Sequence, residues 1–360
     1  MDVIELRAQF PVLDRLAYLN AGTDGPLAGA ARDAAVAELD RELSAGRAKP
    51  HFERRTELTD ALRGAYARLL HCNTADVALT TSTTEGIAQT VAGLRLQRGS
   101  EIVTSDEEHP GLLGALAAAR DLRGVKIREV PFAELAEAVR PKTSLLACSH
   151  VGWKSGSVAP PELAELDVPV LLDGAQGVGA IDFDVTTLGC GAYAGAGQKW
   201  LCGPDGTGML YVSPAMRDRL SVWRRGYGNL ADPAAGLDAG LHHDARRFDT
   251  LSLNAETVAC ALAAIGVFEQ VGWSTVHERA CTLAARLVER LRELGREPAP
   301  RGATTLVSFP SADPEAEREL LAGAGVILRE IPDTPWLRAS VGAWNDDNDL
   351  DRLLATLPQQ

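Results

Sequence analysis

The chain has 360 residues, of which 46% are hydrophobic, and its formal net charge is −13. This length is enough for one large unit and a smaller partner, and the hydrophobic content is enough for a substantial core. The negative charge and the lack of any dense run of Lys and Arg argue against nucleic acid as the natural partner.

The first two thirds of the chain combine helical periodicity with short apolar strands. Residues 28–70 have the pattern of helix, with a break at Lys49-Pro50. Beyond them we predict strands at 77–80, 101–104, 125–130, 143–148, 168–173, 191–194 and 208–212, and helices at 85–94, 111–120 and 132–139. Because these strands are apolar along their whole length and alternate with helices, they predict an α/β fold with a mainly parallel sheet covered on both faces.

The pattern changes near residue 253. Two long helices are predicted at 254–271 and 274–294, followed by strands at 304–309, 326–331 and 337–341 and helices at 313–324 and 347–357. Residues 224–249 are rich in Gly, Asp and His and lack periodicity, which is typical of a long functional loop. We therefore predict a large domain over residues 16–252 and a smaller α+β domain over residues 253–360, joined by residues 1–15.

The cysteines and the N-terminus bear on the compartment. The six cysteines are scattered, with no CxxC pair and no disulfide-like spacing, so we expect reduced, mostly buried thiols and no metal site. The first ten residues lack the basic and then apolar pattern of a signal peptide. No apolar run approaches the length of a membrane span. We expect a cytoplasmic protein without a membrane partner.

Two charged residues follow predicted strands and suggest cofactor chemistry. Asp173 ends the apolar run Val-Pro-Val-Leu-Leu-Asp, and ligands of open α/β sheets lie beyond such strand ends. Lys199 follows the small-residue segment Tyr193-Ala-Gly-Ala-Gly-Gln198 and precedes a Gly/Pro-rich turn. A capping aspartate and a surface lysine are the ordinary interpretations of each alone. As a pair they match pyridoxal phosphate (PLP), which needs a lysine for its imine and a carboxylate for its pyridine nitrogen.

Two further polar segments lie just past predicted strands. Thr80-Thr-Ser-Thr-Thr84-Glu-Gly leads into a helix, and its hydroxyls and free amides are typical of a phosphate site, although a plain N-cap has the same pattern. Ser105-Asp-Glu-Glu-His109-Pro follows the next strand. An imidazole at this place is positioned to stack on a pyridine ring.

With these segments in the order Thr84, His109, Asp173 and Lys199, the sequence resembles the class V aminotransferase family of fold-type I PLP enzymes. That family includes cysteine desulfurases, selenocysteine lyases and isopenicillin N epimerase. The resemblance covers nearly the whole chain, and Asp-Gly-Ala-Gln and Gln-Lys-Trp-Leu-x-Gly-Pro are its most specific segments. It implies a seven-stranded type of large-domain sheet and a smaller C-terminal domain.

For the cofactor, the resemblance implies one role for each matching residue. Lys199 carries PLP as an imine and moves the α-proton, and Asp173 pairs with the pyridine nitrogen. His109 stacks on the ring, and Gln176 donates to the ring hydroxyl oxygen. The residues expected to hold the phosphate are Thr83, Thr84 and Gln198.

For the substrate, the resemblance implies that Arg338 binds the carboxylate of an amino acid as a bidentate partner. Asn20 matches the N-terminal segment that lies over the site. Trp153 replaces an Asn of desulfurases, and Ala196 stands where a Ser often touches the phosphate. Ser252 stands where a Thr commonly reaches the phosphate of the other subunit, which implies a homodimer.

The reactive cysteine of the desulfurases has no counterpart in this chain. In those enzymes it lies on a loop shortly before the carboxylate-binding arginine, whereas here that segment is the short run from Arg329 to Trp336. No cysteine follows Cys281. Cys202, three residues past Lys199, is expected to pack under the next turn. A persulfide carrier must be an accessible thiolate, so this arrangement argues against desulfuration.

The sequence therefore predicts a PLP enzyme acting at the α- or β-carbon of an amino acid, with a C–S or other β-lyase preferred. A class V aminotransferase and an isopenicillin N epimerase-like epimerase remain alternatives, because a fold does not choose among reactions. A cysteine desulfurase or a PLP-binding protein without turnover is less favoured. A mere scaffold has no use for a carboxylate-binding Arg338.

Overall fold

The computed structural model describes residues 1–358, and its largest element is a seven-stranded sheet with the order β2-β8-β7-β6-β5-β3-β4. The strands, in sheet order, are Val77–Thr80, Gly208–Val212, Ala192–Ala196, Val170–Asp173, Thr143–Ser149, Glu101–Ser105 and Lys126–Val130. Of these seven strands, β8 alone runs in the opposite direction to the other six, so the predicted mainly parallel sheet is confirmed.

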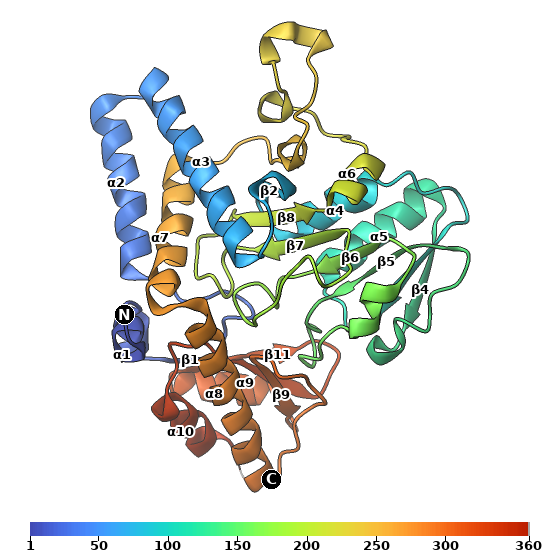
Figure 1. Ribbon diagram of the computed structural model, residues 1–360. Helices are drawn as coiled ribbons and strands as arrows, with labels where there is room; N and C mark the ends of the chain where they lie inside the picture. The colour runs from blue at the N-terminus through green and yellow to red at the C-terminus, as the bar shows by residue number, and fades with distance from the viewer. Residues whose placement is uncertain (359–360) are drawn as a thin grey trace.

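Helices cover both faces of this sheet (Figure 1). Helices α4 (Thr83–Gly93) and α5 (Pro110–Arg123) pack on one face, and α3 (Lys49–Leu69) and α7 (Ala255–Val271) on the other. Neighbouring strand residues therefore enter different cores: Leu171 of β6 packs with α4 and α5, whereas Leu172 packs on the opposite side. A strand buried on both faces has no polar side, which explains its unbroken apolar sequence.

The α2–α3 hairpin projects from one side of the sheet and packs along α7 (Figure 1). Helix α2 (Gly29–Ala45) ends at Gly46, whose φ of +73° lies in the left-handed region that favours glycine. Helix α3 begins at Lys49, with Pro50 in its first turn, where a missing N–H costs nothing. The predicted break in the long helical region is thus confirmed.

The C-terminal part forms a smaller α+β unit. Its antiparallel sheet has the order β11-β12-β9, from strands Arg329–Ile331, Trp336–Ser340 and Leu306–Pro310. Around it lie α8 (Trp273–Glu293), α9 (Pro314–Gly323) and α10 (Asp347–Thr356). The N-terminal segment joins this unit after helix α1 (Val3–Ala8), because β1 (Ala17–Tyr18) pairs with β10 (Val326–Ile327). The division at residues 16 and 253 stays a prediction.

Two segments differ from the sequence expectation. The predicted helix at 132–139 is wrong: a single 3₁₀ turn, Phe132–Glu134, is followed by turns. Prolines at positions 131 and 141 leave too few residues between them for a stable helix. The predicted strand 326–331 is split at Leu328, since its first part pairs with β1 and its second with β12.

The remaining elements are short. Helix α6 spans Pro214–Arg219, and the loop after it contains the 3₁₀ turns Tyr227–Asn229, Pro233–Asp238 and Ala245–Phe248. Among the described residues no single helix meets the length and hydropathy expected of a membrane span; α7 and α8 meet them only together, at an angle of 83°.

Candidate active site

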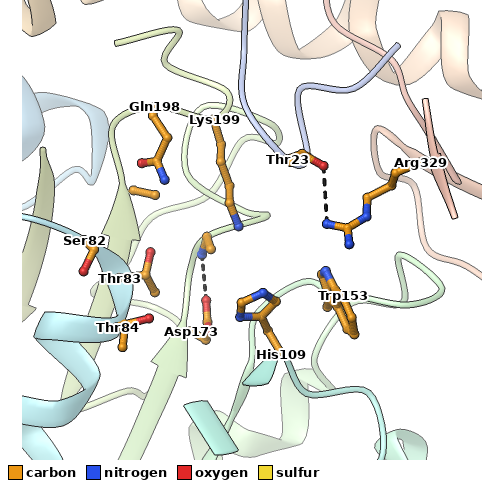
Figure 2. Close-up of a pocket in the computed structure, with 13 residues that line it drawn as sticks. Thr23, Ser82, Thr83, Thr84, His109, Trp153, Asp173, Gln198, Lys199 and Arg329 are labelled. Carbon is orange, nitrogen blue, oxygen red and sulfur yellow. Dashed lines mark hydrogen bonds between the residues drawn. The ribbon is translucent and has the colours of Figure 1, made fainter. Parts of the chain in front are cut away.

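A cavity of about 230 Å³ lies where β6 and β7 end and α4 begins. Figure 2 shows that its side chains come from several separate segments of the chain and converge on one space. The residues predicted from the sequence that line it are Thr83, Thr84, His109, Trp153, Asp173, Gln198 and Lys199. The structure therefore brings together segments from the ends of five different strands, β2, β3, β5, β6 and β7.

Lys199 points into this cavity from the turn after β7 (Figure 2). Burial lowers the pKa of its amine to about 8, and the nearby Arg338 and Arg329 act in the same direction, while Asp173 raises it. The turn is held closed by a hydrogen bond from Gly203 N to Gly197 O at 2.9 Å. The amine is thus fixed and readily neutral, which is the state that attacks a carbonyl.

Asp173 is the last residue of β6 and is buried. Its Oδ1 accepts a hydrogen bond from Ala175 N at 2.9 Å. Burial raises the pKa of this carboxyl, and the positive charge of Lys199 and the Ala175 N–H lower it. A buried carboxylate with so few partners favours a cation beside it, as a protonated pyridine nitrogen would be.

The N-terminus of α4 forms a polar end of the cavity. Ser82 is its N-cap and accepts a hydrogen bond from Glu85 N at 3.1 Å. The Thr83 hydroxyl oxygen is buried and has no hydrogen-bond partner among residues 1–358. Gly86 lets the helix lie close to the sheet, because a Cβ there would be 2.9 Å from Ala194 Cβ of β7. Free amides, an unpaired hydroxyl and the helix dipole together suit a phosphate group.

His109 is the N-cap of α5 and faces Lys199 across the cavity. Its Nδ1 accepts a hydrogen bond from Gly111 N at 3.0 Å, so its proton is on Nε2. Burial lowers the pKa of the imidazole to about 4, and Lys199 and the two arginines add to this effect. The ring is therefore neutral near pH 7, and it meets Trp153 edge-on with centroids 5.1 Å apart.

These features fit PLP: an amine with a lowered pKa, a buried carboxylate, a neutral imidazole and a helix N-terminus with an unpaired hydroxyl face one cavity. Lys199 would hold the aldehyde carbon, Asp173 the pyridine nitrogen, and the α4 N-terminus with Gln198 the phosphate.

Arg338 lies in β12, at the edge of the site, and is completely buried. One guanidinium nitrogen, Nη1, donates to Trp153 O at 2.6 Å, whereas Nε and Nη2 have no partner in the described part of the chain. Burial and Arg329 lower its pKa to about 9. Arg338 does not line the cavity, because Gly22 stands between: a Cβ on Gly22 would be 2.8 Å from Nη2. A buried guanidinium with free donors fits an anionic ligand.

Sequence reasoning missed Arg329, which lines the cavity together with Gly22, Thr23 and Ser82. Arg329 and Arg338 are cross-strand partners in β11 and β12. Arg329 lies over the Trp153 ring at 5.7 Å and donates to the Thr23 hydroxyl at 3.4 Å. The turn signal Pro332-Asp-Thr-Pro335 between the two arginines could have predicted a hairpin that pairs them.

Besides Arg338, three further predicted site residues lie outside the cavity lining, and the roles of all four stay predictions. Asn20 Oδ1 accepts from the Thr23 hydroxyl at 2.9 Å and so holds the N-terminal segment. Gln176 donates to Gly22 O at 2.7 Å and accepts from Trp200 Nε1 at 3.0 Å. Ser252 is exposed and borders a second cavity of about 430 Å³ beside the loop after α6.

All six cysteines lie in the described part of the chain, and none of them lines the Lys199 cavity. Cys202 is completely buried beneath Gly25, where a Cβ would be 2.7 Å from Cys202 Sγ. Burial raises the pKa of its thiol well above the usual value. A buried thiol with a raised pKa is a poor nucleophile, so the packing of Cys202 argues against it as a sulfur carrier.

The chain is similar to known proteins over most of its length. A family model described as aminotransferase class-V matches residues 31–353. A probable cysteine desulfurase of Pseudomonas aeruginosa is 29% identical over 98% of this chain and 96% of its own length. Isopenicillin N epimerase of Streptomyces clavuligerus is 28% identical over 60% of this chain and 58% of its own length.

Among solved structures, the cystine C–S lyase C-DES in complex with its reaction product cysteine persulfide superposes with a TM-score of 0.92. It is 28% identical, and the match covers 96% of this chain and 98% of C-DES. Another structure of C-DES has glycine covalently linked to its PLP cofactor.

Proposed function

The chain belongs to the aminotransferase class-V family of PLP-dependent enzymes, and on this premise we propose that it is a C–S lyase. The substrate would be an amino acid that carries sulfur on its β-carbon and a second anionic group beyond the sulfur. The observation that carries the proposal is the pair Arg338 and Arg329, neither of which has a carboxylate partner among the described residues. Arg329 lines a cavity without a thiol, and Arg338 lies behind Gly22 at the edge of that cavity.

The proposed reaction is a β-elimination. When bound, PLP supplies an electron sink for negative charge at the substrate α-carbon. Lys199 accepts the α-proton on its amine, and the bond between the β-carbon and sulfur breaks with both electrons going to sulfur. Cystine and water would give pyruvate, ammonium and cysteine persulfide, so no external oxidant or reductant is needed. Asp173 holds the charge of the cofactor ring, and His109, being neutral, covers it without adding charge.

Arg338 is the proposed anchor for the α-carboxylate. Its two unpaired nitrogens, Nε and Nη2, would donate to the two oxygens of a carboxylate, which would also remove the penalty of a buried free cation. Arg329 supports a second anionic group, because its side chain borders the same cavity from the paired position on the next strand. Cystine has both carboxylates, and C-DES, a cystine C–S lyase, is similar over nearly the whole chain.

A desulfurase is not supported, because the thiol that would take up the sulfur is missing. The hairpin between Ile331 and Trp336 is short, and none of its residues is a cysteine. Cys202, the nearest in sequence to Lys199, is completely buried.

An aminotransferase is the second candidate, and the same arginine pair supports it. A dicarboxylic keto acid would use Arg338 and Arg329 as the amino acid does, so the cavity has a place for a second substrate. An epimerase remains an alternative within the family, without a specific observation in its favour.

The experiment that tests the proposal supplies the PLP-loaded protein with cystine, cysteine, a cysteine S-conjugate and aspartate. A C–S lyase releases pyruvate and ammonium from the sulfur substrates without any keto acid being added. Activity that appears only when a keto acid is supplied, with amino-group transfer to it, would replace the lyase by an aminotransferase.

We also propose a cytoplasmic homodimer. Ser252, the exposed Tyr227 and the loop after α6 border the second cavity, where a partner subunit would complete the surface. Closed two-fold dimers are the commonest assemblies of soluble enzymes. Light scattering that finds an active monomer at assay concentration would refute the dimer.

A further inference from the structure

Two consecutive glutamates, Glu107 and Glu108, lie between β3 and α5 and belong to none of the roles above. They reach in different directions. Glu108 is buried and accepts hydrogen bonds from Ser149 N at 3.0 Å and from Ser149 Oγ at 2.7 Å, so it ties the loop to the end of β5. The carboxylate of Glu107 instead contacts the turn over residues 152–157.

The carboxylate of Glu107 holds this turn from outside. Its Oε2 accepts from Ser155 N at 3.0 Å and from Ser155 Oγ at 2.7 Å. Gly152 lies so close that a Cβ there would be 2.4 Å from Glu107 Oε2. Gly156, at the other end of the turn, has a φ of +87°. A turn with two glycines has many accessible conformations, and the carboxylate selects one of them.

Trp153, within this turn, contacts both arginines of the substrate site. Its carbonyl oxygen accepts the Arg338 Nη1 hydrogen bond at 2.6 Å, and its ring lies under Arg329. Trp153 N in turn donates to Glu107 O at 3.3 Å. A shift of the turn would therefore move the acceptor that directs the Arg338 guanidinium.

We propose that Glu107 is a positioning residue for substrate recognition: by fixing the turn over 152–157 it sets the direction of Arg338 and hence the affinity for the α-carboxylate. The inference rests on the proposed role of Arg338. The path runs through hydrogen bonds: Glu107 accepts from Ser155 and from Trp153 N, and the Trp153 carbonyl oxygen accepts from Arg338 Nη1.

The test uses two ligands that differ only in the carboxylate, glycine and methylamine, and follows the change in cofactor absorbance of the holoenzyme. No turnover is needed. Glu107→Ala should weaken glycine binding about tenfold to hundredfold, since small displacements of an anchoring group cost that much. Its methylamine binding should stay as in the wild type. Glu107→Gln should restore glycine binding, because its amide oxygen can accept the same two hydrogen bonds.

Three further variants serve as a charge control, a second test of the turn and a benchmark for the loss of the Arg338 anchor. Glu129→Ala removes an exposed carboxylate on β4 and controls for net charge. Ser155→Ala, which keeps the backbone donor, should give a smaller glycine-specific loss, and it replaces Glu107→Ala if that variant does not fold. Arg338→Met is the benchmark and should abolish the preference for glycine over methylamine.

The outcomes separate the two claims. If Arg338→Met leaves glycine binding unchanged, the proposed carboxylate anchor is wrong. If Arg338→Met weakens glycine binding but Glu107→Ala and Ser155→Ala do not, the anchor stands and the role of Glu107 is overturned. Equal losses for glycine and methylamine in Glu107→Ala would also overturn it, because the effect would then be on the cofactor or the fold.

Discussion

The cavity has two walls that are built in different ways. The cofactor wall, with Asp173, Lys199 and His109, comes from the ends of three parallel strands of one sheet, β6, β7 and β3. The substrate wall joins segments that are far apart: Trp153 and Arg338 meet across 185 residues, and Thr23 and Arg329 across 306. On the proposed roles, the reaction type would depend on local strand-end motifs, whereas the choice of substrate would depend on contacts between residues far apart in the sequence.

The largest expected loss of turnover comes from replacing Lys199, in the cofactor wall. On the role proposed for Lys199, Lys199→Ala would lose both the cofactor attachment and the proton acceptor, so turnover should fall by at least about 10²–10⁴-fold. Borohydride reduction of the wild-type holoenzyme, followed by peptide mapping, should place the modification on Lys199. Full activity of the alanine variant would remove Lys199 from the reaction.

Asp173→Asn tests the same wall with a smaller change. Replacing the buried carboxylate by a neutral amide weakens a charge-assisted hydrogen bond of roughly 1.5–3 kcal/mol, or about ten- to a hundredfold. We expect the loss in turnover to exceed the loss in PLP occupancy, because the electron sink is affected most. Absorbance of bound cofactor measured beside initial rates separates the two, and normal turnover would contradict the role.

The difference between the walls also explains what the sequence could predict. Asp173, His109 and Lys199 each follow an apolar strand, so their convergence at one sheet edge was predictable from the strand pattern alone. Arg329 was not, because its place depends on the hairpin register that sets it opposite Arg338. Likewise the helix expected at 132–139 failed on local grounds, since the flanking prolines outweighed its apolar spacing.

The same distinction holds for the fold: elements with a local sequence pattern could be predicted, and pairings between distant segments could not. The β/α alternation predicted the parallel sheet. No pattern in the sequence near Ala17 predicts that this residue pairs with Val326, because the pairing joins segments near the two ends of the chain. The bond from Gln176 to Gly22 O is a long-range contact of the same kind.

Arg329→Met changes only the substrate wall and should have a selective effect. We expect KM for cystine to rise about tenfold, as for a charge-assisted hydrogen bond of roughly 1.5 kcal/mol, with kcat nearly unchanged. A cysteine S-conjugate with a neutral substituent is the control, and its KM should not move. An equal rise in KM for both substrates would mean that Arg329 does not recognise the second anionic group.

The smallest expected effect is a shift in the pH dependence of the rate at which the apoprotein captures PLP. Because burial lowers the pKa of Lys199 to about 8 while Asp173 raises it, PLP capture by the apoprotein should accelerate as pH rises through about 8. In Asp173→Asn the lost negative charge lowers that pKa further, so the midpoint should move to lower pH. Stopped-flow absorbance measures the rates. A midpoint that stays or rises would contradict this coupling.

The most direct test of the C–S lyase proposal is to follow the sulfur. The holoenzyme is incubated with cystine, and protein and small molecules are then alkylated and analysed separately by mass spectrometry. We predict one pyruvate and one ammonium for each cystine cleaved, persulfide only among the small molecules, and a protein of unchanged mass. A stoichiometric persulfide on Cys202 that disappears together with activity in Cys202→Ser would contradict the lyase and restore a desulfurase.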